Sequence, residues 1–352
     1  MNSIDKIDRN FEVKTIIEDT LNFFSSLDTP FRIHGLISTP KGFARMPEET
    51  AMAVNEGVAM LFRNTAGGRL RFRTNSPKVA IRAKMDNIGK MPHFALSGSA
   101  GFDLYEGSIY RGTFIPPFDI EDGYESMIVL SGIKERDLTV HFPLYSNVIS
   151  LEIGLCEGAT LSPAPDYGRK LPVVYYGSSI TQGGCASRPG NCYENIISRN
   201  LDCDHINLGF SGSARGEDVI ADYIANLPMS VFVYDYDHNA PSVEHLRNTH
   251  RPMFRHIREK NPLLPIVMVS RPQPNPTAEE LQRRDIIRST YEEASAAGDR
   301  NVYFIDGSAM LGQFGGDSGT VDSCHPNDLG FMCMAKSIGE VVERLLNRST
   351  PL

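Results

Sequence analysis

The feature that most constrains the fold is an alternation, after residue 168, of short apolar runs with longer helix-forming stretches. The runs are rich in β-branched and aromatic residues, as in buried strands, and cover residues 171–176, 205–208, 231–234, 266–269 and 302–305. Helix-forming composition fills residues 217–227, 243–259 and 279–296, and the pattern at 329–346 predicts a closing amphipathic helix. This order predicts a parallel sheet with helices on both faces, joined by right-handed crossovers.

The first part of the chain instead has the period-two pattern of strands. Apolar residues alternate with others at 69–73, 79–84, 138–142 and 151–155, and Gly, Pro, Asn and Asp cluster between these segments. We therefore predict an antiparallel β-sandwich that ends near Leu161, followed by a Pro-bearing connector at 162–168. Because 352 residues exceed the usual size of one core, we predict a β domain over 1–165, with its leading segment and linker, and an α/β domain over 166–352.

Charge and cysteine content limit the possible partners. A formal net charge of −8 gives no electrostatic footprint for nucleic acid or an anionic membrane, so neither is expected as a partner. The six cysteines show no tight CxxC spacing and are expected to be reduced thiols without a disulfide or metal role. The N-terminal residues lack an apolar signal core, and no later stretch has the length of a membrane span. We expect a cytoplasmic protein, or a periplasmic or secreted one if a leader was removed; the oligomeric state stays open.

Three side chains suggest a serine hydrolase. Ser179 lies where the apolar run of residues 173–176 breaks into a small-residue turn, which is how a chain exposes a nucleophile. Asp322 stands three residues before His325, close enough to share one turn. A serine hydroxyl needs an imidazole to take its proton and a carboxylate to orient that imidazole. The chain therefore carries the groups that acyl transfer requires.

The candidate residues follow different strands of the predicted sheet. Ser179 follows the first strand, Gly212 the second, Asn239 the third, and Asp322 and His325 the fifth. Ligands of open α/β sheets bind beyond the carboxyl ends of the strands, so all five should meet at one edge. Each alone has a structural explanation as a cap, a turn former or a local hydrogen-bonding group. Their combination favours catalysis.

Two motifs resemble a known superfamily. The block Gly177-Ser178-Ser179-Ile180-Thr181-Gln182-Gly183, with the later glycine loop, the asparagine and the terminal Asp-x-x-His, resembles the SGNH/GDSL hydrolases. Residues 101–105, Gly-Phe-Asp-Leu-Tyr, resemble the GxDLY signature of a β domain found ahead of bacterial enzymes of this type. The resemblance implies a three-layer α/β/α flavodoxin-like hydrolase domain after a jelly-roll-like N-terminal sandwich.

The resemblance also implies roles for individual residues. Ser179 would be the nucleophile, His325 the base and Asp322 its orienting partner. The backbone N–H groups of Ser179 and Gly212 and the side-chain amide of Asn239 would form the oxyanion hole. No metal and no organic cofactor is implied.

One residue departs from the family pattern. The position before the nucleophile is usually Asp, whereas this chain has Ser178. The proton chemistry does not require that carboxylate, but its absence leaves open how the loop is organised and whether Ser178 or Ser179 attacks. We favour Ser179, because it aligns with the family serine.

Several functions remain open at this stage. The sequence predicts an esterase that acts on small-acyl esters, with an acetylated carbohydrate as the substrate suggested by analogy. Lipase or thioesterase activity and a catalytically silent saccharide-binding protein are the alternatives. A metal-dependent phosphoesterase is a rival, in which Asp235, Asp237 and His238 would join Asp322 and His325 as ligands.

Other polar and aromatic residues are expected to lie outside the site. Arg271 reads as a solvated residue at a strand end, and His245, His250 and His256 read as exposed helix residues. Core packing is the expected role for most of Phe102, Tyr105 and Tyr110. Whether the front domain contributes residues to the site stays open.

Overall fold

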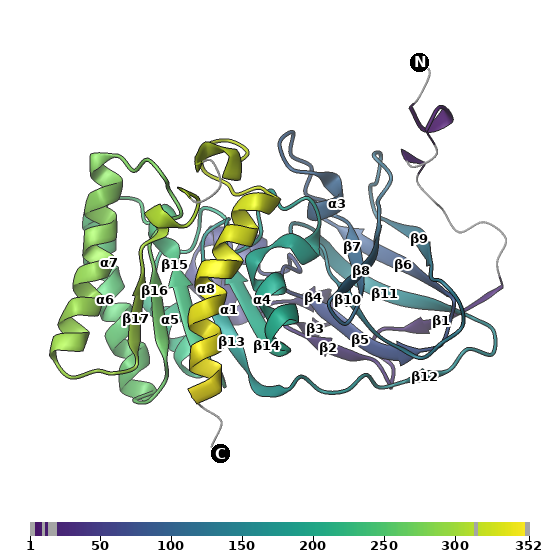
Figure 1. Cartoon of the computed structure of the whole chain (residues 1–352), viewed down its shortest axis with the longest axis horizontal. Helices are drawn as coiled ribbons and strands as arrows, with labels where there is room; N and C mark the ends of the chain where they lie inside the picture. The colour runs from purple at the N-terminus through teal and green to yellow at the C-terminus, as the bar shows by residue number, and fades with distance from the viewer. Residues whose placement is uncertain (1–3, 9–10, 13–19, 313–315, 349–352) are drawn as a thin grey trace.

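The second half of the chain forms a parallel five-stranded sheet in the computed structural model, which describes residues 4–8, 11–12, 20–312 and 316–348 (Figure 1). The strand order is β14-β13-β15-β16-β17, so the first strand in sequence is not at an edge. The strands are β13 (Arg169–Gly177), β14 (Cys203–Gly209), β15 (Val231–Asp235), β16 (Ile266–Val269) and β17 (Val302–Ile305). The predicted α/β fold class is confirmed.

Five helices cover the two faces of this sheet. Both faces are apolar, because successive residues of each strand point to opposite sides of the sheet. The helices are α4 (Tyr193–Leu201), α5 (Asp218–Ala225), α6 (Val243–Lys260), α7 (Ala278–Ala296) and α8 (Asp328–Arg348). Val173 and Tyr175 of β13 belong to one apolar core with residues of α4 and α8. Val174 and Tyr176 belong to a second core with residues of α5, α6 and α7.

Helix α4 is the element of this half that the sequence pattern did not predict. Six of its nine residues are buried, and they include Glu194, Asn195 and Ser198. Because several buried positions of α4 are polar, the helix lacks the continuous apolar stripe by which an amphipathic helix is recognised in a sequence.

The front part of the chain forms two antiparallel sheets packed face to face (Figure 1). One has the order β1-β11-β6-β9; the other has the order β12-β5-β10-β7-β8, with β2 also paired to β5. Their strands are β1 (Leu21–Ser25), β2 (Arg32–His34), β5 (Arg69–Thr74), β6 (Lys78–Asp86), β7 (Phe102–Glu106), β8 (Ile109–Phe114), β9 (Gly123–Val129), β10 (Arg136–His141), β11 (Asn147–Cys156) and β12 (Leu161–Ser162). The predicted sandwich is confirmed.

Short elements of the front part join the two halves. They are the hairpin of β3 (Ile37–Thr39) and β4 (Gly42–Ala44) and the helices α1 (Glu48–Val54), α2 (Glu56–Leu61) and α3 (Leu96–Ser99). Helix α1 contacts α5, and Ala51 and Val58 share an apolar core with Leu208 of the parallel sheet. The two halves therefore bury apolar surface against each other, and the boundary between 165 and 166 stays a prediction.

The side chains of Arg271, His245, His250 and His256, all expected at the surface, are buried or engaged. His245 and His256 are only partly exposed: His245 Nε2 lies 2.8 Å from the Arg215 carbonyl oxygen, and His256 Nε2 lies 3.2 Å from Asp222 Oδ1. His250 is 2% exposed; its Nδ1 lies 3.0 Å from Thr290 Oγ1 and its ring stacks on Tyr234, so the expectation of an exposed histidine is wrong there. Helices α6 and α7 pack together, and the face of α6 that carries His250 is covered by α7. Arg271 is also mostly buried, because its guanidinium binds Asp237 and Glu280.

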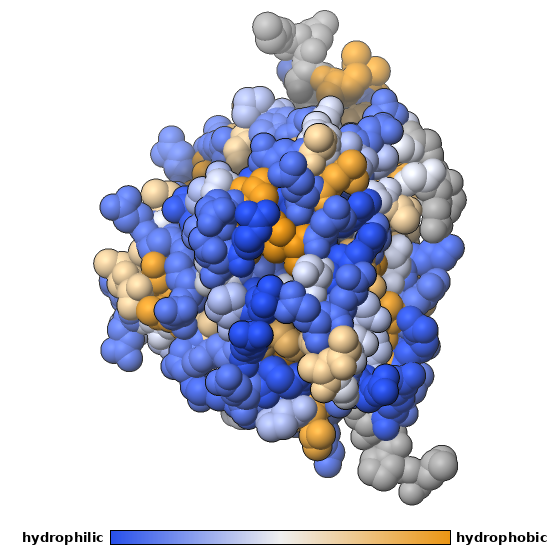
Figure 2. Space-filling view, turned by 90° about the vertical axis from the view of Figure 1, so that its left-hand side faces the viewer, coloured by the Kyte–Doolittle hydropathy of each residue, from blue (hydrophilic) through white to orange (hydrophobic). Residues whose placement is uncertain are grey.

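The end of the molecule at which α6 and α7 lie has a mostly hydrophilic surface, with apolar residues exposed in small groups (Figure 2). All six cysteines are free thiols. Among the described residues, no helix combines the length and the apolar character that a membrane span requires.

Candidate active site

The turn after β13 carries Ser179 to the carboxyl edge of the parallel sheet. Strands β14, β13 and β15 end in register, with Gly177 opposite both Gly209 and Asp235, so the loops that follow them meet. Ser178 is fully buried, and its Oγ accepts a hydrogen bond from the Ile180 N–H at 3.1 Å. The Ser178 side chain thus stabilises the local turn.

Ser179, His325 and Asp322 form a continuous hydrogen-bonded chain. Ser179 Oγ lies 2.9 Å from His325 Nε2, and His325 Nδ1 lies 2.8 Å from Asp322 Oδ2. The other oxygen, Asp322 Oδ1, accepts from the backbone N–H of His325 at 2.7 Å and of Cys324 at 3.1 Å. Both carboxylate oxygens are therefore fixed, and they fix the imidazole in turn. Ser178 has no part in this chain.

The charge on Asp322 is stabilised by these donors. Partial burial raises the pKa of Asp322, but the hydrogen bonds from the His325 backbone and side chain and from the Cys324 N–H outweigh it and lower the pKa from 3.8 to about 2. The carboxylate is consequently ionised throughout the neutral range, as a group that orients and stabilises an imidazolium must be.

Gly212 and Asn239 lie in the two loops that follow the neighbouring strands. Gly212 has a φ of +67°, and no atom lies within 4 Å of the position that a Cβ would occupy, so the space beside it is open. Asn239 Oδ1 accepts from the Ala214 N–H at 3.4 Å, which ties these two loops together. The Ser211 N–H donates to Gln182 Oε1 at 3.0 Å and ties the loop of Gly212 to the turn that carries Ser179.

The residues of the rival metal site are engaged elsewhere. Asp235 is buried and accepts a hydrogen bond from Thr181, and Asp237 is buried and pairs with Arg271. His238 Nδ1 faces the Cys324 thiol at 3.8 Å. Within the described ranges, these residues do not join Asp322 and His325 in a group with closely spaced ligand atoms.

The front domain contributes side chains to the surroundings of the candidate site, and these were not identified from the sequence. The Tyr145 hydroxyl donates to the Ser179 carbonyl at 3.2 Å, and Gln182 Nε2 donates to Asn64 Oδ1 at 3.1 Å. His93 Nε2 lies 3.8 Å from Asp322 Oδ2. A lone histidine or tyrosine in a β-rich segment carries no local signal of this role, because only the packing of the two halves brings it to the site.

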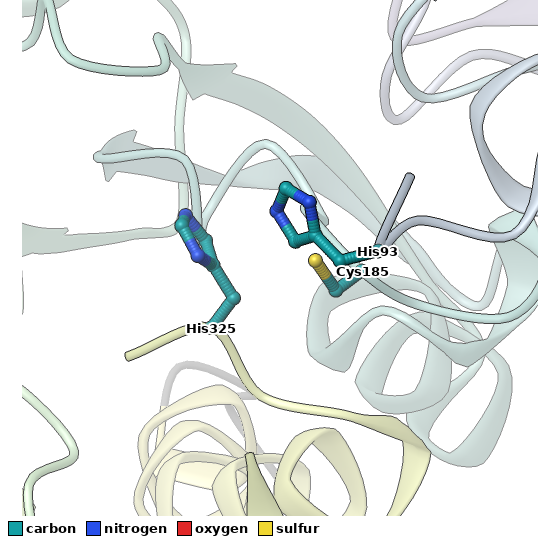
Figure 3. Close-up of side chains that lie close together, drawn as sticks. All are labelled: His93, Cys185 and His325. Carbon is teal, nitrogen blue, oxygen red and sulfur yellow. The ribbon is translucent and has the colours of Figure 1, made fainter. Parts of the chain in front are cut away.

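His93, Cys185 and His325 form a further group at this edge (Figure 3). Each offers one ligand atom, and these atoms lie within 4.8 Å of one another. Burial, and the nearby charge of Asp322, raise the pKa of the Cys185 thiol to about 11, so the thiol is neutral at pH 7.

The close approach of β14 to the turn that carries Ser179 predicts a large loss of stability when Gly209 is replaced. A Cβ at this position would lie 2.2 Å from the Gln182 backbone nitrogen and 2.5 Å from the Thr181 carbonyl carbon, so Gly209→Ala must displace the turn. We expect the free energy of unfolding to fall by about 3 kcal/mol. Gly312→Ala is the matched control, since that glycine is exposed and has open space around it. Denaturant unfolding of both variants checks this; equal stability would contradict the described packing.

Both halves of the chain match known families. Residues 170–343 match the GDSL-like lipase/acylhydrolase family, and residues 21–161 match the N-terminus of esterases of the SGNH-hydrolase type. No curated protein matches the chain.

Solved structures share the whole two-part architecture. A protein assigned as a GDSL-like lipase from Bacteroides ovatus is 27% identical over 93% of this chain and 98% of its own, with a TM-score of 0.84. The salicylyl-acyltransferase SsfX3, from a tetracycline biosynthetic pathway, is 22% identical over 94% and 98%, with a TM-score of 0.77. A family two carbohydrate esterase from Clostridium thermocellum is 14% identical over 91% and 99%, with a TM-score of 0.63. The acyltransferase and the carbohydrate esterase show that the fold is shared. The two family matches together cover both halves of the chain. The chain therefore belongs to the GDSL-like lipase/acylhydrolase family of serine ester hydrolases and carries a GxDLY-type domain at its N-terminus.

Proposed function

We propose that the protein is a serine esterase that forms an acyl intermediate on Ser179. The observation that carries this proposal is the unbroken chain from Ser179 Oγ to His325 Nε2, at 2.9 Å, and from His325 Nδ1 to Asp322 Oδ2, at 2.8 Å. A general base must lie within hydrogen-bond reach of the proton that it removes, and His325 meets this condition at Ser179.

The proposed reaction has two halves. His325 takes the Ser179 proton as Oγ attacks the ester carbonyl, and it then protonates the alcohol that leaves. His325 next takes a proton from water, which attacks the acyl-serine, and the proton returns to Ser179 as the carboxylic acid departs. The Asp322 carboxylate accepts a hydrogen bond from the His325 Nδ1–H group throughout and stabilises the imidazolium that forms in each half.

The developing negative charge requires preorganised donors. We assign this role to the backbone N–H groups of Ser179 and Gly212 and to the side-chain amide of Asn239. Because Asn239 Oδ1 is held by the Ala214 N–H, the Nδ2 group of the amide faces away from that bond. The open space beside Gly212 supports the placement of the substrate oxygen and acyl group there.

This assignment predicts a rate defect for Asn239→Ala. We expect kcat to fall by about a hundred- to a thousandfold with a smaller change in KM, because the lost donor acts mainly on the transition state. Asn248→Ala is the matched control, since Asn248 lies exposed on α6 and binds Glu244. Steady-state kinetics on one ester decide the point; an Asn239→Ala enzyme with wild-type kcat would remove Asn239 from the oxyanion hole.

The proposed substrate is a small-acyl ester, with acetyl on a carbohydrate as the specific class. Only 8% of Ser179 is exposed, and acetyl needs the least room beside it. The same two-part fold occurs in the family two carbohydrate esterases and in an acetyl xylan esterase from Butyrivibrio proteoclasticus. This part of the proposal rests on analogy of fold.

An ester panel tests the substrate class. The panel contains acetylated sugars, p-nitrophenyl esters of rising chain length and acyl-thioesters, each assayed with and without EDTA. We expect the highest kcat/KM on acetyl sugars and no loss with EDTA, because the serine mechanism uses no metal. A preference for long acyl chains or thioesters would replace the substrate class with lipase or thioesterase activity, and loss of activity with EDTA would favour a metal mechanism.

A further inference from the structure

We propose that His93, Cys185 and His325 form a Zn²⁺ site, and that zinc bound there inhibits the enzyme. A thiolate and two imidazoles are typical ligands of Zn²⁺, whereas Mg²⁺ and Ca²⁺ prefer oxygen ligands. The ligand atoms of His93, Cys185 and His325 already lie within 4.8 Å of one another. Figure 3 shows that the three side chains come from separate segments and approach a common space.

The geometry requires little movement to bind the ion. Zinc takes sulfur at about 2.3 Å and nitrogen at about 2.0–2.1 Å, so the ligand atoms of a tetrahedral site lie about 3.5 Å apart. A contraction of about 1 Å therefore closes the site. The side chain of His93 is 46% exposed and sits in the segment between β6 and α3, where a change of rotamer meets little obstruction. Cys185 is 8% exposed and lies in the tight turn that also carries Ser179.

The inhibition follows from the hydrogen bonds that His325 already makes. Its Nε2 is bonded to Ser179 and its Nδ1 to Asp322, so both ring nitrogens are in use. A metal ion on either nitrogen displaces one of these bonds and removes the base or its orientation. The Cys185 thiol releases one proton to solvent as the Zn–S bond forms, and nothing is oxidised or reduced. Three protein ligands leave a fourth position for water.

The site spans the two halves of the chain. His93 belongs to the front domain, whereas Cys185 and His325 belong to the hydrolase half. Bound zinc would therefore also link the halves across the active site. The inhibition rests on the proposed role of His325, but the binding of zinc does not.

Binding is tested directly with Co²⁺, which replaces Zn²⁺ and gives a near-ultraviolet thiolate-to-metal absorption band. The wild-type protein and Ser179→Ala should both show the band, and Zn²⁺ should abolish it. Cys185→Ser should lack it, while Cys324→Ser, which changes the nearby thiol that faces His238, should keep it. A wild-type protein without the band, or a band that survives Cys185→Ser, overturns the site.

Inhibition is tested by titrating Zn²⁺ into the ester assay. We expect wild-type activity to be lost and then restored by EDTA. Cys185→Ser should keep its metal-free activity and raise the half-inhibitory Zn²⁺ concentration at least about tenfold, and His93→Gln should raise it similarly. Circular dichroism and thermal unfolding verify that each variant is folded. Stimulation by zinc, or inhibition that is equal in wild type and Cys185→Ser, overturns the inhibitory role. If no ester is turned over, the proposed function fails, and the cobalt band still decides the metal site.

Discussion

Replacing Ser179 with alanine should lower kcat by about a million-fold, the scale of loss when a serine hydrolase loses its nucleophile. The hydroxyl that we propose as the acyl acceptor is then absent, and the neighbouring hydroxyl of Ser178 is not expected to replace it. Ser178 is fully buried, and its Oγ is held by the Ile180 N–H in the local turn. Initial rates on an acetyl ester measure the effect.

The matched control is Ser178→Ala. This change removes one hydrogen bond of the turn, which costs about 1 kcal/mol of stability. A measurable fraction of the wild-type rate should therefore remain. The opposite pattern, with Ser178→Ala inactive and Ser179→Ala active, would make Ser178 the nucleophile and reverse the assignment.

The second large effect is expected when His325 or Asp322, the other two residues hydrogen-bonded in series with Ser179, is replaced. His325→Gln should lower kcat by about a million-fold, and Asp322→Asn by about 10⁴-fold. In Asp322→Asn, the amide oxygen can still accept from the backbone N–H groups that Asp322 binds. Its NH₂ group would then face His325 Nδ1 and favour the tautomer in which Nε2 carries the proton and cannot act as a base. Rates of both variants on one ester, with circular dichroism to verify folding, measure this.

The effects should not add. In the proposed mechanism the three groups act as one unit, so Ser179→Ala combined with His325→Gln should be about as slow as either single variant. Additive losses would show that the two residues act in separate steps, contrary to the proposed mechanism.

The Asp322 carboxylate also makes the stability of the folded protein depend on pH in the acidic range. The pKa of Asp322 is depressed in the folded protein, from 3.8 to about 2. Its contribution to stability is therefore fully present above about pH 4 and is lost as the pH falls through about 2. Asp322 does not titrate between pH 5 and 9 on this account, so any change of activity in that interval must arise from other groups.

The sequence predicts the parallel sheet well, because its strands are short and strongly β-branched. The run at 231–234 and the strand Val231–Asp235 differ by one residue, and the runs at 266–269 and 302–305 coincide with their strands. Since such strands end at one edge, the order of Ser179, Gly212 and Asn239 along the chain also predicts that their loops are neighbours. Their roles in catalysis stay predictions.

What the sequence could not show depends on packing between the halves. Tyr145 reaches the Ser179 carbonyl, and His93 approaches Asp322, across the junction of the two domains. Neither residue is close to Ser179 in sequence, and neither lies in a recognisable motif. The burial of His250 likewise does not follow from its local sequence, because α7, which comes later in the chain, covers it.

The most direct test of the central claim is covalent labelling with a fluorophosphonate probe, followed by peptide mass mapping. The probe reacts only with a serine that a neighbouring base activates. We predict a single label on the peptide that contains Ser179 in the wild-type protein, and no label in Ser179→Ala or His325→Gln. A folded wild-type protein that stays unlabelled while it binds saccharides, or a label on another serine, would contradict the proposed acyl-enzyme mechanism.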